Sequence, residues 1–104
     1  MRDISKMMQQ AKKIQERAAK LQDDLRAERI EATAGGGVVR AVTNGHGELL
    51  EVTIDPSAVD PADVSMLQDL VVAAVSEAQR SAKELSAQRM KELAGGLGLP
   101  PGLV

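Results

Sequence analysis

The chain has 104 residues, which is enough for one domain. Its 13 basic and 15 acidic side chains give a net charge of −2, and it contains no Cys, Phe, Trp or Tyr. The missing cysteine excludes disulfide scaffolds, thiolate metal sites and cysteine nucleophiles. The missing rings exclude nucleic-acid-binding domains that stack bases on aromatic side chains. The sequence shows neither an apolar run of about 20 residues nor a signal-peptide region, so we expect a soluble, cytoplasmic protein.

Residues 4–25 have the pattern of a long helix. Apolar side chains recur at spacings of three and four, as in the seam of a coiled coil, and no Gly or Pro interrupts them. The seam consists of Ile4, Met7, Ala11, Ile14, Ala18, Leu21 and Leu25. At 1.5 Å per residue, this helix would be about 33 Å long.

The middle of the chain, residues 28–56, changes to the pattern of strands. Apolar and polar residues alternate in 30–34 and again in 51–54, and β-branched residues dominate 38–43. The sequence of residues 44–47, Asn-Gly-His-Gly, is typical of a hairpin turn. We therefore predict three short antiparallel strands in a meander, which Pro56 ends because proline cannot donate to a continuing ladder.

A second long helix is predicted after the strands. Asp60 would cap it, Pro61 would occupy its first position, and no breaker follows until Gly95 and Gly96. This defines a single domain over residues 1–94 and a flexible Gly/Pro tail over 95–104.

The first half of the second helix is apolar nearly all round, which indicates burial on more than one side. A chain of this size buries only about two-thirds of its unfolded surface, and here without aromatic side chains. We therefore expect a homodimer whose interface combines strand faces with this helix. The helix residues predicted for that interface are Leu67, Leu70, Val71, Ala74, Val75 and Ala78.

The small net charge hides a strong asymmetry. Residues 1–22 carry a net charge of +4 and residues 80–104 carry +2, whereas residues 23–79 carry −8. Helices of about 33 and 45 Å would overhang a sheet of about 20 Å. If the helices pack antiparallel, the two basic blocks meet at the overhanging end.

A basic stripe on the first helix is the best candidate for a binding surface. Lys6, Lys13 and Lys20 are seven residues apart and share one face, with Lys12 and Arg17 beside them. Such a stripe fits the phosphates of a DNA duplex, but a solvated face of a coiled coil is the more common reason for it. The full set predicted to contact DNA is Lys6, Lys12, Lys13, Arg17, Lys20, Arg80, Lys83, Arg89 and Lys91.

Catalytic and cofactor motifs are missing from the sequence. His46 has no second histidine or cysteine to complete a metal site, and two of the three residues Asp55, Asp60 and Asp63 are better explained as a strand-end and a helix-cap residue. The glycines at 35–37 precede a strand rather than a helix, unlike a phosphate-binding loop. We predict no enzyme activity, no metal, no cofactor and no small-molecule substrate.

Five segments in this order resemble the YbaB/EbfC nucleoid-associated protein family: residues 8–16, 44–45, 53–57, 66–74 and 99–102. The resemblance implies a tweezers-shaped homodimer that binds double-stranded DNA with limited sequence preference in the bacterial nucleoid. Two features depart from the family pattern, namely the absence of a Gly-rich lead-in and the small Ala41 in the second strand.

Two hypotheses follow for this α+β chain. The first is a dimeric DNA-binding protein. The second is a structural or chaperone-like clamp that holds protein clients through Met7, Met8, Ile14 and Met90, with lysines that only keep its arms soluble. Salt separates them, because phosphate binding weakens steeply with salt whereas hydrophobic capture persists.

Overall fold

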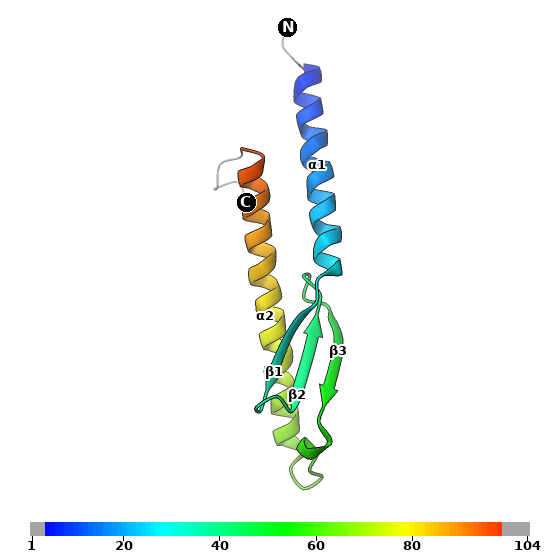
Figure 1. The fold of residues 1–104 in the computed structure, drawn as a ribbon, viewed down its shortest axis with the longest axis vertical. Helices are drawn as coiled ribbons and strands as arrows, with labels where there is room; N and C mark the ends of the chain where they lie inside the picture. Colours follow the sequence, from blue (N-terminus) through cyan, green and yellow to red (C-terminus); the bar gives the residue numbers. More distant parts are fainter. Residues whose placement is uncertain (1–3, 99–104) are drawn as a thin grey trace.

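The structure is a computed structural model that describes residues 4–98. The chain is elongated, measuring 76 × 22 × 16 Å, with a small sheet near one end and a long helix on either side of it in the sequence (Figure 1). This order of elements confirms the predicted α-β-β-β-α fold. In chain order the elements are α1 (Ile4–Ala27), β1 (Ile30–Ala34), β2 (Val39–Thr43), β3 (Leu49–Ile54), the short 3-10 helix η1 (Pro56–Ala58) and α2 (Val64–Gly96).

The three strands form the predicted antiparallel meander in the order β1-β2-β3. The glycines at 35–37 all have positive φ, which explains why the tight turn between β1 and β2 contains this residue type. Ala41 of β2 lies opposite Ala32 of β1 and opposite Val52 of β3. Since residues opposite each other share a face, all three side chains point to the same side of the sheet.

Helix α2 covers that side of the sheet, but mainly over β1 and β2 (Figure 1). Val39 and Ala41 of β2 and Ala74 and Ala78 of α2 are fully buried between the two elements. Alanine on both surfaces lets the helix backbone approach the sheet closely. The core is consequently thin, and it is built without any large side chain at its centre.

The predicted interface residues of α2 are placed differently by the structure. Ala74 and Ala78 are 0% exposed within the single chain. Their assignment to a dimer interface was wrong, because they belong to the chain's own core. The other four pack partly against this core and keep some accessible surface; they are Leu67, Leu70, Val71 and Val75.

The ends of α2 also differ from the prediction. Asp63, not Asp60, caps the helix by accepting a hydrogen bond from the Met66 N–H at 3.2 Å. Asp60 instead accepts from the Ala62 N–H at 2.9 Å and forms a separate turn before the helix. At the other end Gly95 and Gly96 are helical, so the helix extends two residues into the predicted tail. Residues 99–104 of that tail lie outside the described part of the chain.

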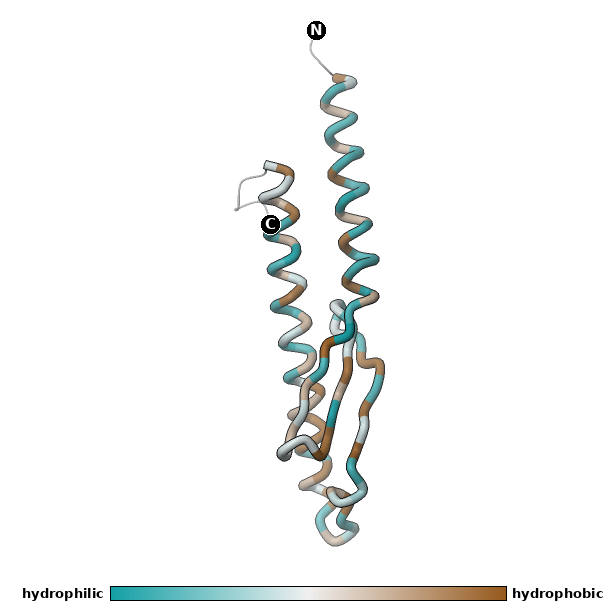
Figure 2. The backbone as a smooth tube through the Cα atoms, in the orientation of Figure 1, coloured by the Kyte–Doolittle hydropathy of each residue, from teal (hydrophilic) through white to brown (hydrophobic). Residues whose placement is uncertain are grey.

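The two helices run side by side beyond the sheet, and α1 extends further than α2 (Figure 1). The predicted apolar seam of α1 is therefore covered only in part. Leu25 is buried and Ile14 is half-buried, whereas Ile4 and Met7 are 64% and 66% exposed. In Figure 2 brown positions recur along the upper part of α1.

Candidate nucleic-acid interface

The structure divides the nine basic residues predicted to contact DNA into two groups. Six of them form no ion pair with any carboxylate of residues 4–98, while Lys20, Arg80 and Arg89 are paired. The unpaired six are Lys6, Lys12, Lys13, Arg17, Lys83 and Lys91.

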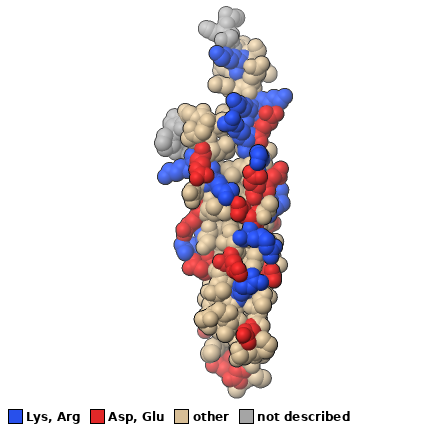
Figure 3. Space-filling view, in the orientation of Figure 1, with Lys and Arg blue, Asp and Glu red and all other residues tan. Residues whose placement is uncertain are grey.

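Four of the unpaired residues lie on residues 4–17 of α1, a segment we call the arm. At 100° per residue, Lys6, Lys13 and Arg17 fall within about 40° of one another around the helix, and Lys12 lies on a neighbouring flank. Glu16 is the one acidic residue in this segment. Figure 3 shows blue side chains over the upper and middle parts of the molecule, including the part of α1 that extends past α2. The arm is thus a narrow, strongly basic rod.

The three paired residues face acidic neighbours. Lys20 binds Asp24 at 3.0 Å, and Arg80 binds Glu77 at 2.6 Å as well as Glu84. The hydrogen bond and charge of Glu77, with the charge of Glu84, raise the pKa of Arg80 above its ordinary value. These cations are already neutralised locally, so they contribute less positive potential than the arm residues.

Arg89 has a structural contact rather than a free charge. Its guanidinium donates to Glu28 at 2.8 Å, and this hydrogen bond raises the pKa of Arg89. Both side chains are about one-third exposed, and they are 61 positions apart in sequence. The pair therefore ties α2 to the junction between α1 and β1.

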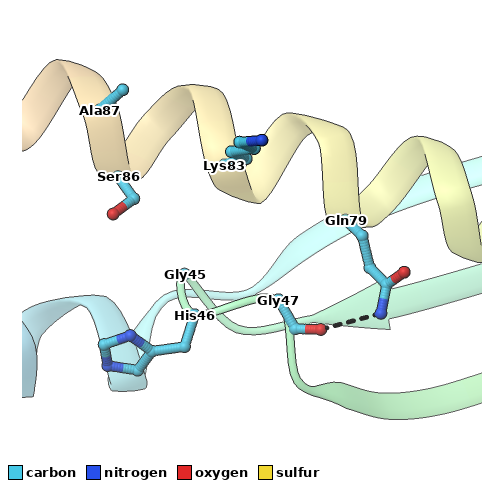
Figure 4. A pocket seen from close by; sticks show the side chains of 7 residues that line it. All are labelled: Gly45, His46, Gly47, Gln79, Lys83, Ser86 and Ala87. Atoms are coloured by element: carbon cyan, nitrogen blue, oxygen red, sulfur yellow. Dashed lines mark hydrogen bonds between the residues drawn. The ribbon is translucent and has the colours of Figure 1, made fainter.

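Lys83 lies apart from the arm. It lines a groove between α2 and the turn of residues 44–47, together with Gln79, Ser86 and His46 (Figure 4). Leu97, at the end of α2, lies beside Gln10 and Ile14, so Lys83 is about 21 Å further from the arm along the helix axis. Lys83 is thus separated from the basic residues of the arm.

The opposite end of the molecule is acidic. In Figure 3 red side chains occupy the lowest part of the view, below the sheet. Asp55, Asp60 and Asp63 lie in this region, in the connection from β3 to α2. The backbone N–H of Ser57 donates a hydrogen bond to the Asp55 carboxylate at 2.9 Å. This hydrogen bond and a weaker contribution from the Ser57 side chain lower the pKa of Asp55. The long axis therefore runs from the basic arm to an acidic end at the connection from β3 to α2.

No group of three His, Cys, Asp or Glu side chains within residues 4–98 is arranged to hold a metal ion. No helix in the same part of the chain is both long and apolar enough to span a bilayer. His46 has a structural contact that was not predicted: its Nε2 hydrogen-bonds to the backbone carbonyl of Gln22 at 3.1 Å. Nothing in the sequence pattern signals this contact, because the partner is a backbone atom 24 positions away.

Strand β3 carries a second candidate surface, which is apolar. The sequence predicted it only in general terms, as one of the strand faces in the dimer interface. Val52 and Ile54 lie opposite the buried Ala41 and Val39, so they point to the side that α2 covers. Helix α2 scarcely reaches β3, and the two side chains remain 37% and 36% exposed. Leu49 and Leu50 extend this exposed apolar strand towards the arm.

Fold and charge together define a class of protein, an α-β-β-β-α chain with two parts. The sheet β1–β3 and the part of α2 packed on it form what we call the base, and the base supports the basic helical arm. The model of the YbaB/EbfC DNA-binding family matches residues 1–97. The chain belongs to this family, which confirms the resemblance drawn from its sequence.

Individual relatives agree with this assignment. The chain is 48% identical over 100 residues to a protein of Syntrophobacter fumaroxidans named a nucleoid-associated protein, covering 92% of this chain and 91% of the relative. A protein of Dictyoglomus thermophilum with the same name is 47% identical, over 99% of each chain. The crystal structure of an uncharacterized protein from Helicobacter pylori matches the fold with a TM-score of 0.73 at 23% identity, covering 93% and 98% of the two chains.

Proposed function

We propose that this protein is a non-enzymatic, nucleoid-associated protein that binds double-stranded DNA with low sequence specificity. The observation that carries the proposal is the arm, where Lys6, Lys12, Lys13 and Arg17 extend from the base without ion pairs to the described carboxylates. Membership of a family described as DNA-binding and the names of the curated relatives support it. Its place in the cell would then be the nucleoid of the cytoplasm.

The chemistry of the arm favours phosphates over bases. Lysine and arginine side chains on a helix neutralise the duplex backbone and release its counterions, which gives affinity without reading sequence. Lys6 and Lys13 are separated by about 10.5 Å along the helix axis, while the duplex carries one charge per about 1.7 Å. Each of these side chains therefore has a phosphate within reach in many registers of the arm on DNA.

A homodimer completes the proposed binding surface. The uncovered face of β3, with Val52 and Ile54, continues into the half-exposed side chains Val71 and Val75 of α2. A second copy is the occupant that we propose, because a chain of this size with so thin a core needs further apolar burial. Two-fold symmetry pairs the same surface on both chains and would place two basic arms on one particle.

The deciding experiment measures binding to a random-sequence duplex at several salt concentrations. The variant Lys6/Lys13/Arg17→Gln is compared with Arg26/Arg29/Arg80→Gln, which removes the same number of positive charges from ion-paired positions. We expect the arm variant to bind more weakly and to lose up to about 0.9 of salt slope per lost contact. The matched variant should stay near wild type. Equal losses in both would show that net charge, not the arm, determines affinity.

The exposed apolar tip of the arm favours a second candidate function. Met7 and Met8 are each 66% exposed beside Ile4, as expected for a chaperone-like clamp that grips unfolded clients. Of the other residues predicted for this role, Ile14 is half-buried and Met90 is 37% exposed. Suppression of a client's aggregation that persists in high salt, without binding to DNA at low salt, would favour the clamp over the DNA-binding protein.

A further inference from the structure

The C-terminal end of α1 is held by the turn of residues 44–47, which joins β2 to β3. The Gly45 N–H donates to the carbonyl oxygen of Leu25 at 2.7 Å. The Nε2 of His46 lies 3.1 Å from the carbonyl oxygen of Gln22. Because a carbonyl oxygen can only accept, Nε2 is the protonated nitrogen in this contact. The turn thus supplies two donors to carbonyls near the end of α1, of which that of Leu25 belongs to the last four that lack an i+4 partner within the helix.

Gly45 is required for this contact by its small size rather than by its backbone conformation, since its φ is not positive. A Cβ atom at this position would lie 2.7 Å from the Leu25 oxygen and 2.8 Å from the Leu25 Cδ2. Leu25 is completely buried. Any side chain larger than hydrogen at position 45 would therefore force α1 away from the turn.

The turn itself is held rigidly to the rest of the base. The side-chain oxygen of the buried Asn44 accepts from the N–H groups of His46 and Glu48, at 2.9 and 3.1 Å. On the other side, Gln79 of α2 donates to the carbonyl oxygen of Gly47 at 3.1 Å (Figure 4). The same short segment consequently contacts α1, the sheet and α2.

The geometry gives this segment a large effect at the arm. Lys6 lies about 24 Å along the helix axis from Gln22, so a tilt of about 15° at the turn moves the tip by roughly 6 Å. Away from the turn, α1 and α2 touch mainly through partly buried side chains such as Ile14 and Leu21. These contacts offer less resistance to tilting than the hydrogen bonds and close packing at the turn.

We infer that residues 44–47 form a latch that fixes the direction of the arm and, through it, the position of the basic residues on the duplex. The first part concerns the structure of the free protein. The second part rests on the proposed DNA-binding function. His46 and Gly45 act here as positioning residues, because neither lies on the arm that would contact DNA.

Distance measurements between spin labels on α1 and α2 test the latch. The chain contains no cysteine, so Gln9→Cys and Ser76→Cys, at two exposed positions, take the labels without side reactions. Each labelled protein is mixed with excess unlabelled chain, so that a dimer contains one labelled copy. We expect a single narrow distance in the parent and a shifted or broadened one after Gly45→Ala.

Gly95→Ala is the matched control, because a Cβ there meets nothing within 4 Å. It should leave the distance distribution narrow. An unchanged distribution in the folded Gly45→Ala variant would overturn the latch. If Gly45→Ala fails to fold, the pair His46→Leu and His46→Gln decides instead. Leucine removes the donor to Gln22 and should broaden the distribution, whereas glutamine retains an N–H donor and should restore it; equal distributions in both would overturn the role of His46.

DNA binding by the same variants separates the latch from the proposed function. We expect Gly45→Ala, with all basic residues intact, to weaken duplex binding several-fold. A broadened distance with unchanged affinity would overturn the link between arm direction and DNA. If instead the arm variant Lys6/Lys13/Arg17→Gln binds DNA as well as wild type, the proposed function fails, while the distance measurement still supports or overturns the latch as a structural device.

Discussion

The base and the arm of this molecule are stabilised in opposite ways. In the base, Val39, Ala41, Ala74 and Ala78 are fully buried, and every strand is paired with a neighbour. In the arm, residues 4–13 of α1 are exposed on all sides. The fold therefore depends on small side chains packed closely in the base, while the charges proposed for binding lie where they contribute little to folding.

The largest expected effect comes from breaking the base. Ala74→Asp places a carboxylate in a site without accessible surface, against Val39 and Ala41. An unpaired buried charge costs several kcal/mol, roughly 4 or more in free energy of unfolding. Urea denaturation followed by circular dichroism should show a largely unfolded chain. Ser76→Asp, two residues away on the exposed side of the same helix, is the control and should unfold near the wild-type midpoint.

The second effect separates folding of the base from its association. Val52/Ile54→Thr keeps β-branched residues in β3 but makes the uncovered apolar face polar. We expect the proposed dimer to weaken by about 2–4 kcal/mol, because apolar side chains are lost from both copies, while each chain keeps its helix and strand content. Sedimentation velocity measures the mass as a function of concentration. A dimer as strong as wild type would show that the chains associate through another surface.

These two surfaces show where sequence reasoning succeeded and where it stopped. Periodicity predicted both helices and all three strands, since a period of 3.6 or 2 is a local property. It could not distinguish a helix face buried in its own chain from one buried against a partner, and so Ala74 and Ala78 were misassigned. The same apolar pattern serves both purposes, and only the position of α2 over β1 and β2 decides between them.

Some partners of the charged residues were also beyond prediction from local sequence patterns. Counting residues located the basic segments correctly at the overhanging ends of the helices. It did not show that Arg80 faces Glu77 and Glu84, or that Arg89 reaches Glu28. The Arg80 pairs follow helical spacing and were readable in principle, whereas Arg89 and Glu28 are 61 residues apart. The contact of His46 with Gln22 was equally invisible, since it depends on how a turn meets a helix end.

A smaller effect is expected at the acidic end of the base. Hydrogen bonds from Ser57 lower the pKa of Asp55 below its ordinary value of 3.8. The folded state therefore favours the ionised carboxylate, and this contribution is complete above the unfolded pKa and lost as the pH falls through the folded one. Asp55→Asn retains an oxygen acceptor but does not titrate. Comparing unfolding midpoints at pH 7 and pH 3 should show a slightly weaker acid destabilisation in the variant; an identical pH dependence would contradict the assignment.

The smallest expected effect on stability is in the arm. Lys6/Lys13/Arg17→Gln changes three side chains that make no ion pairs with the described carboxylates and lie on the exposed part of α1. Exposed substitutions of this kind stay within about 0.5 kcal/mol of wild type, and glutamine is nearly as good a helix former as lysine or arginine. Urea unfolding should therefore be unchanged in the same variant for which we predict the largest loss of DNA affinity. A drop of more than about 1 kcal/mol, well outside that surface range, would mean that the arm helps to hold the base together. The separation between a stabilising base and a binding arm would then have to be abandoned.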